Sequence, residues 1–290
     1  MKRFICLFIM CLTVLSCLTG CLKRNKMEDI RIITTIYPIE YVTDRLYGDK
    51  SEVSSIYPRG AVSSKYSITG KQLNDYSQYD MFIYNGREGI EREYATKMLN
   101  NNKNLKIIDA SYGIGSVYST SDIWLNPSNI LMLGQNIKNQ LSEYVSAKNL
   151  IKDIKTNYSL LKENITELET EIKKTADNSI SNTIVSYDES LNFLEKYGFN
   201  VVNLTYNGKN KERNIETARE LISSGKISYI FVMENFEEND LVKDFLNNYS
   251  VDTLIFRDID TINEKDVENK DDYLSIMYDN VELLKDETYK

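Results

Sequence analysis

The sequence predicts an α/β fold of two lobes, each with a small, mainly parallel sheet flanked by helices. Short segments rich in β-branched residues alternate with helical segments, which is the pattern of parallel sheets. The alternation stops over residues 146–174, where apolar residues recur every three or four positions, and it resumes afterwards. One long helix is therefore expected to join the two lobes.

The first residues have the polarity of a secretory signal. Lys2 and Arg3 precede the apolar residues 4–18, a stretch too short for a spanning helix of about 20 residues. Residues 18–21, Leu-Thr-Gly-Cys, resemble a bacterial lipobox, whose cysteine carries lipid after cleavage. We therefore expect an extracytoplasmic protein anchored to the bacterial cell membrane through Cys21. An ordinary signal peptide or an uncleaved anchor is the alternative.

The amino-terminal lobe is predicted from four short strands with helices between them. Gly48 closes the first helix, and Pro58 and Gly60 stop the second strand. The predicted strands are Ile30–Ile36, Val53–Tyr57, Met81–Tyr84 and Leu105–Ile108. Tyr37-Pro38 is expected to turn the chain into a helix over Ile39–Leu46, a second helix is expected at Leu73–Ser77, and another is expected to start near Asn126-Pro127.

The connecting helix is predicted over Ser146–Lys174. Its apolar residues share one face, with Lys and Glu between them: Leu150, Ile151, Ile154, Tyr158, Leu161, Ile165, Leu168 and Ile172. Only about three heptads are present, so a single helix packed along a globular body is favoured over a coiled coil.

The carboxyl-terminal lobe repeats the alternation. Its predicted strands are Thr183–Ser186, Asn200–Leu204, Tyr229–Met233 and Val251–Phe256. Its predicted helices are Ser190–Tyr197, Asn214–Ser223, Glu238–Asn248 and Tyr273–Leu284. The whole chain is then divided into a signal peptide, a lipid-anchored tether, an amino-terminal lobe, a connecting helix and a carboxyl-terminal lobe, at residues 1–20, 21–28, 29–145, 146–177 and 178–290.

Composition excludes several classes of function. All four cysteines, Cys6, Cys11, Cys17 and Cys21, lie in the signal region, so disulfides and cysteine-ligated zinc are not expected in the mature body. Without residues 1–20 the chain has 33 Lys and Arg against 43 Asp and Glu, and nucleic acid is an unsuitable partner. The chain contains no histidine, which removes Ser/His and Cys/His catalysis, and we do not expect an enzyme.

Several ordered motifs resemble the metal-binding subunits of zinc and manganese ABC importers, the adhesin-type solute-binding proteins. They are Ile33-Thr34-Thr35-Ile36-Tyr37-Pro38, Tyr57-Pro58-Arg59-Gly60, the run of residues 79–86, Ile123-Trp124-Leu125-Asn126-Pro127 and residues 272–277. The resemblance covers nearly the whole mature chain. It implies an ABC permease as partner, a monomeric protein, and one divalent metal ion held in the cleft between the lobes.

The resemblance also implies a ligand set, which this chain alters. Carried over by position, the four metal ligands are Ser64, Asp122, Tyr187 and Asp258. Only Asp258 keeps a ligand type of the family. An all-oxygen set favours manganese or iron over zinc, which prefers nitrogen and sulfur donors. Each residue also has an ordinary structural interpretation, such as a loop hydroxyl, a polar turn, an apolar cap on the cleft or a loop aspartate.

Two functions follow as hypotheses. The first is a membrane-anchored solute-binding protein of a metal-ion ABC importer, with the long helix as a spine that limits closure to a small tilt. The second is a degenerate surface lipoprotein that binds no metal and acts as an adhesin or a protein-interaction module. Whether Glu189 or Glu234 replaces a missing ligand is left open by the sequence.

Overall fold

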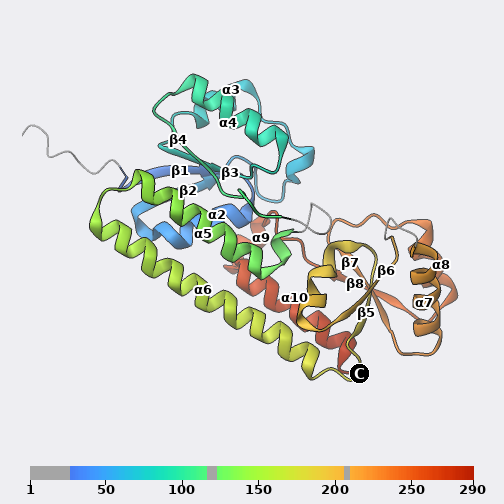
Figure 1. Cartoon of the computed structure of the whole chain (residues 1–290). Helices are drawn as coiled ribbons and strands as arrows, with labels where there is room; N and C mark the ends of the chain where they lie inside the picture. The colour runs from blue at the N-terminus through green and yellow to red at the C-terminus, as the bar shows by residue number, and fades with distance from the viewer. Residues whose placement is uncertain (1–26, 116–122, 206–209) are drawn as a thin grey trace, which may run out of the picture.

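Two α/β lobes lie along one long helix in the computed structural model, which describes residues 27–115, 123–205 and 210–290 (Figure 1). The predicted fold class is confirmed. The signal region, Cys21 and Asp122 lie outside the described residues. The predicted domain boundaries stay a prediction.

The amino-terminal sheet is parallel, with strand order β2-β1-β3-β4. Its strands are β1 (Ile30–Thr34), β2 (Ser51–Ser55), β3 (Met81–Tyr84) and β4 (Lys106–Asp109). One face is covered by α2 (Tyr37–Tyr47) and α5 (Pro127–Tyr144), and the other by α3 (Gly70–Tyr76) and α4 (Gly89–Asn101) (Figure 1). Short 3₁₀ turns lie at η1 (Gly48–Lys50), η2 (Ser63–Lys65) and η3 (Ile123–Leu125).

The long helix α6 spans Lys148–Asp177, close to the predicted range. Its apolar stripe faces the protein because the residues recur with the helical period, and it packs on α2, α5 and α10. The buried members of the stripe are Leu150, Ile154, Leu161, Ile165, Leu168 and Ile172. These residues belong to one continuous apolar core that also includes residues of both sheets.

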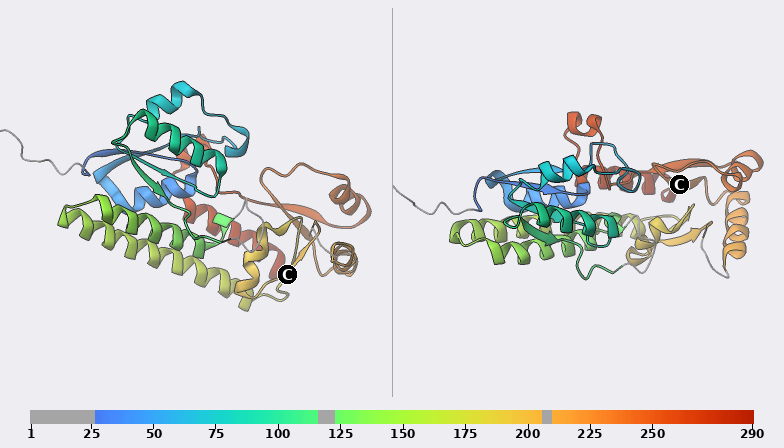
Figure 2. Two further views of the ribbon diagram at one scale, coloured as in Figure 1. Left: turned by 45° about the horizontal axis from the view of Figure 1, so that its top comes forward. Right: turned by 90° about the horizontal axis from the view of Figure 1, so that it is seen from above.

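The carboxyl-terminal sheet is also parallel, in the order β6-β5-β7-β8. Its strands are β5 (Thr183–Ser186), β6 (Asn200–Asn203), β7 (Tyr229–Met233) and β8 (Asp252–Phe256). The remaining elements are η4 (Glu189–Tyr197), α7 (Lys211–Ser223), α8 (Asp240–Asn248), α9 (Glu264–Asn269) and α10 (Tyr273–Thr288). Figure 2 shows α7 and α8 at the end of this lobe and α10 along the middle of the molecule.

Two of the predicted helices differ from the structure in their start or their type. Tyr37 and Pro38 form the first turn of α2 rather than a turn before it, since proline at the start of a helix loses no intrahelical hydrogen bond. The segment predicted as a helix at Ser190–Tyr197 is a 3₁₀ helix that ends at Gly198, whose φ of 106° allows the left-handed turn. Among the described residues, every helix is too short or too polar to cross a membrane.

Candidate functional site between the lobes

A cavity of about 570 Å³ lies between the two lobes. Its amino-terminal side is lined by Ile36, Tyr57, Val62, Ser63, Ser64, Lys65, Asn85, Glu88, Ile90, Glu91 and Trp124. Its carboxyl-terminal side is lined by Tyr187, Asp188, Met233, Asn235, Phe236, Asp258, Asp260 and Thr261. Polar and apolar side chains therefore both line a space large enough for a small solute.

The cavity is built from the carboxyl ends of the strands. Ile36 follows β1, Asn85 follows β3, Tyr187 follows β5 and Asp258 follows β8. Ligands of open parallel sheets bind outside these ends, because the connecting loops converge there. The topology thus brings together side chains that are far apart in the sequence.

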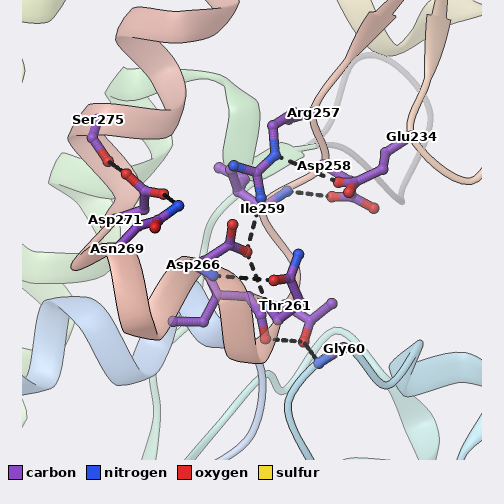
Figure 3. Close-up of polar contacts among 12 residues, drawn as sticks. Gly60, Glu234, Arg257, Asp258, Ile259, Thr261, Asp266, Asn269, Asp271 and Ser275 are labelled. Atoms are coloured by element: carbon purple, nitrogen blue, oxygen red, sulfur yellow. Dashed lines mark hydrogen bonds and ion pairs between the residues drawn. The ribbon is translucent and has the colours of Figure 1, made fainter.

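Asp258 is the predicted ligand with the best-defined surroundings. Its Oδ1 atom accepts hydrogen bonds from the backbone N–H groups of Ile259 at 2.6 Å and Asp260 at 3.1 Å. Burial raises the pKa of the Asp258 carboxyl, the two N–H donors oppose that rise, and the nearby Glu234 carboxylate adds to it. Figure 3 shows Asp258 and Glu234 beside each other where the chain leaves β8.

Tyr187 and Ser64 line the same cavity from opposite lobes. The Asn239 side-chain amide donates a 2.6 Å hydrogen bond to the Tyr187 hydroxyl, and the Tyr187 ring packs on Phe236 with centroids 4.5 Å apart. Ser64 lies in the exposed η2 turn. Three predicted positions therefore share one cavity, whereas the fourth, Asp122, lies outside the described residues. Their role as metal ligands stays a prediction.

Four further carboxylates line the cavity, and the sequence did not single them out: Glu88, Glu91, Asp188 and Asp260. Neither Glu189 nor Glu234, the replacements left open above, is among the lining residues. The only signal in the sequence was position, since each of the four follows a strand or starts a helix near one.

Glu91 is the most deeply buried of these carboxylates, with 1% of its surface exposed. It accepts hydrogen bonds from the Asn85 N–H at 2.9 Å and the Tyr57 hydroxyl at 3.2 Å. Burial raises its pKa to about 7, and hydrogen bonds from Thr35, Asn85 and Tyr57 hold it from rising further. Either a proton on the carboxyl or a cation beside it would therefore stabilise Glu91 at the cavity wall.

The segment that carries Asp258 is attached to the amino-terminal lobe. The Tyr37 N–H donates to the Asp260 carbonyl at 2.9 Å, and the Gly60 N–H donates to the Ile262 carbonyl at 2.9 Å. Gly60 also donates to the Thr261 hydroxyl, as Figure 3 shows, and its φ of 73° favours glycine. The motif at residues 57–60 therefore joins the lobes beside the cavity.

Among residues 27–115, 123–205 and 210–290, no group of three His, Cys, Asp or Glu side chains is placed to hold a metal ion. Asp258 has one carboxylate oxygen committed to backbone donors, and the Tyr187 hydroxyl has a partner in Asn239. Because Asp122 lies outside the described residues and Ser64 and Tyr187 are not carboxylates, the predicted ligand set stays a prediction.

The family model "Zinc-uptake complex component A periplasmic" matches residues 32–287. The chain belongs to this family. Because the match runs from β1 to the last turn of α10, both lobes and the cavity between them are part of the family fold.

The proteins similar to this chain are named for binding or transporting metal ions. The zinc-binding lipoprotein AdcA of Streptococcus pneumoniae is 22% identical over 93% of this chain, which spans only 58% of that relative. The manganese ABC transporter substrate-binding lipoprotein PsaA of Streptococcus pneumoniae is 24% identical, over 93% of each chain. The structure of the Zn(II)-bound ZnuA-like domain of AdcA is similar with a TM-score of 0.70 and 21% identity, over 90% of this chain and all of that one. These likenesses establish the fold.

Proposed function

We propose that this chain is the membrane-anchored, extracytoplasmic solute-binding subunit of a metal-ion ABC importer and captures a divalent metal ion between its lobes. The observation that supports the proposal most directly is the shared cavity of Ser64, Tyr187 and Asp258 in a member of the zinc-uptake family. Asp122 and Cys21 keep their predicted roles as metal contact and lipid anchor. An ABC permease is the proposed partner, and the protein is proposed to act as a monomer.

The chemistry of the lining favours manganese over zinc. Carboxylate, hydroxyl and amide oxygens line the cavity, and the chain has no histidine. Oxygen donors suit hard divalent ions, whereas zinc binds most tightly to imidazole and thiolate.

Calorimetric titration of the chelator-treated protein with Mn²⁺, Fe²⁺, Zn²⁺ and Ca²⁺ tests the proposal. We expect one site, with Mn²⁺ bound more tightly than Zn²⁺. Asp258→Asn should weaken Mn²⁺ by about tenfold or more, because it removes a unit charge from a partly desolvated site. Asp252→Asn is the matched control, since Asp252 is an exposed aspartate at the other end of β8. Absence of heat with every ion would disprove metal capture.

A second function is favoured by one observation. Because no three carboxylates among the described residues converge on a point, the chain is also suited to a degenerate role as an adhesin or protein-interaction lipoprotein. That role predicts no ion binding, and an Asp258→Asn protein that behaves as the parent does in every titration.

A further inference from the structure

A basic surface runs along the amino-terminal half of α6, in a chain whose net charge is −8. We propose that this surface lies against the headgroups of an anionic lipid bilayer and sets how the anchored protein is oriented on its membrane. The inference rests on the membrane anchor of the proposed function, and it does not depend on the metal ion. The lysine surface consists of Lys138 on α5 and four residues of α6: Lys148, Lys152, Lys155 and Lys162.

The helical period places the four lysines of α6 on one face. With 3.6 residues per turn, residues seven positions apart lie about 20° apart around a helix, and residues four apart lie about 40° apart. Lys148, Lys155 and Lys162 are spaced by seven positions, and Lys152 lies between the first two. All four side chains are exposed. They therefore form one row of positive charge on the side of α6 away from its buried stripe.

No acidic side chain interrupts this row. The acidic residues next to it in sequence, Asp153 and Glu163, lie about 100° or more around the helix from the neighbouring lysines. The row ends at Glu169, which is paired with Lys196 at 2.9 Å. Among residues 27–115, 123–205 and 210–290, none of the five lysines has a carboxylate within ion-pair distance. The positive charge of the row is therefore available to an anionic partner.

Lys138 extends the lysine surface onto α5. Its Nζ atom lies 4.1 Å from the centroid of the Tyr158 ring of α6. Partial burial and the charge of Lys155 lower the pKa of Lys138, so two ammonium groups lie near each other at the junction of the helices. Glu143 is the one acidic residue of α5, and it lies about 140° around that helix from Lys138. An anion beside the junction would relieve this repulsion.

The path of the chain favours a membrane as the anionic partner. The Tyr47 hydroxyl donates a 3.0 Å hydrogen bond to the carbonyl of Met27, the first described residue, and the side-chain amide of Asn157 on α6 donates to the Leu46 carbonyl at 3.0 Å. Figures 1 and 2 show the start of the described chain and the start of α6 at the same end of the molecule. The six residue steps from Cys21 to Met27 span roughly 20 Å at most. A lipid on Cys21 would therefore keep this end of α6 close to the bilayer.

Charge decides which face of the protein meets the bilayer. Each lysine near an anionic surface strengthens binding roughly fivefold, and the effect falls off within about 8 Å in physiological salt. The rest of the protein carries the excess of acidic residues and is repelled. Because the lysine row follows the helix axis, α6 is expected to lie along the membrane surface.

Acetylation of lysines on vesicles tests this orientation. The mature chain from Cys21 onward, which retains every described residue, is coupled through the Cys21 thiol to a maleimide lipid. The vesicles contain phosphatidylcholine alone, or phosphatidylcholine with an equal amount of phosphatidylglycerol. We expect Lys152 and Lys155 to be acetylated about fivefold more slowly on the anionic vesicles, and high salt should remove this protection. Lys226 and Lys243, exposed lysines of the carboxyl-terminal lobe, should keep their rates.

Two variants with the same change in net charge show whether the lysines act together. Lys152→Gln/Lys155→Gln should lose most of the protection of Lys162, because two charges of the row are gone. Lys226→Gln/Lys243→Gln should retain that protection in full. Equal acetylation of Lys162 on neutral and anionic vesicles, or equal protection of the control lysines in the parent, would overturn the inference.

The outcomes separate this inference from the proposed function, because the coupling needs neither cellular lipidation nor a metal ion. Protected lysines without ion binding in the calorimeter would leave the lysine surface standing and disprove metal capture. Ion binding without protection would do the reverse. Mass spectrometry of the protein from its native membrane tests the lipid on Cys21 separately. If soluble polyphosphate protects the lysines and anionic vesicles do not, the partner is an anionic polymer and the membrane assignment is wrong.

Discussion

Glu91 and Glu93 lie two residues apart on α4 and have opposite surroundings. Glu91 is 1% exposed and faces the cavity wall, whereas Glu93 is exposed and pairs with Lys97 at 2.6 Å. Burial without a cationic partner raises the pKa of Glu91 to about 7, from an ordinary value of 4.5. The same side-chain chemistry thus costs stability at one position and is nearly neutral at the other.

Stability should therefore fall as pH rises through 7 because of Glu91. The folded state favours the protonated carboxyl, so this contribution is full below the unfolded pKa and is lost above the folded pKa. Between pH 5 and pH 8 the loss is about 2–3 kcal/mol in the free energy of unfolding. Urea unfolding should show this slope in the parent and in Glu93→Gln, and a flatter one in Glu91→Gln. An unchanged slope in Glu91→Gln would contradict the assignment.

The sequence predicted part of this site and missed the rest for a physical reason. Ser64, Tyr187 and Asp258 were found by position in motifs, and all three line the cavity. Glu91 has no such signal, because one buried glutamate in a helix with exposed neighbours resembles any solvated position. Only the packing of α4 against Tyr57 and Asn85 distinguishes it.

At the scale of elements, buried strands were the most predictable. Three strands match their predicted bounds, β3, β5 and β7, because continuous apolar runs lie at the centre of parallel sheets. The edge strand β2 begins two residues earlier than predicted, since its half-exposed Ser and Glu residues carry little apolar pattern. The α4 and α9 helices were not predicted, and their burial is limited to a few residues.

The packing of α6 on α5 gives a prediction for Leu161, and the preceding residue, Leu160, provides the control. Leu161 is 2% exposed, and its Cδ2 atom lies 3.1 Å from where a Cβ would stand on Gly134 of α5. Leu161→Ala should lower the free energy of unfolding by about 2–5 kcal/mol, because a cavity remains between closely packed helices. Leu160, 53% exposed, should tolerate alanine within about 0.5 kcal/mol. Urea midpoints of the two variants make the comparison, and equal losses would contradict this packing.

At the scale of the whole molecule, two of the connections between the lobes bear directly on their motion. The apolar core continues from the first sheet through α6 and α10 into the second lobe. On the cavity side, the segment after β8 is hydrogen-bonded to Tyr37 and Gly60 of the first lobe. A wide hinge would break these bonds, so cargo binding should involve a small tilt.

Spin labels on the outer helices can measure that tilt. All four native cysteines lie at or before residue 21, so Lys97→Cys on α4 and Glu216→Cys on α7 accept labels selectively in the mature protein. Both side chains are exposed, at 52% and 64%. Pulsed electron–electron double resonance should give one distance distribution whose mean moves by less than its width when a saturating concentration of Zn²⁺ or Ca²⁺ is added. A second, well-separated distance on addition of the ion would mean that the bonds at Tyr37 and Gly60 open, and that the lobes close like a hinge around their cargo.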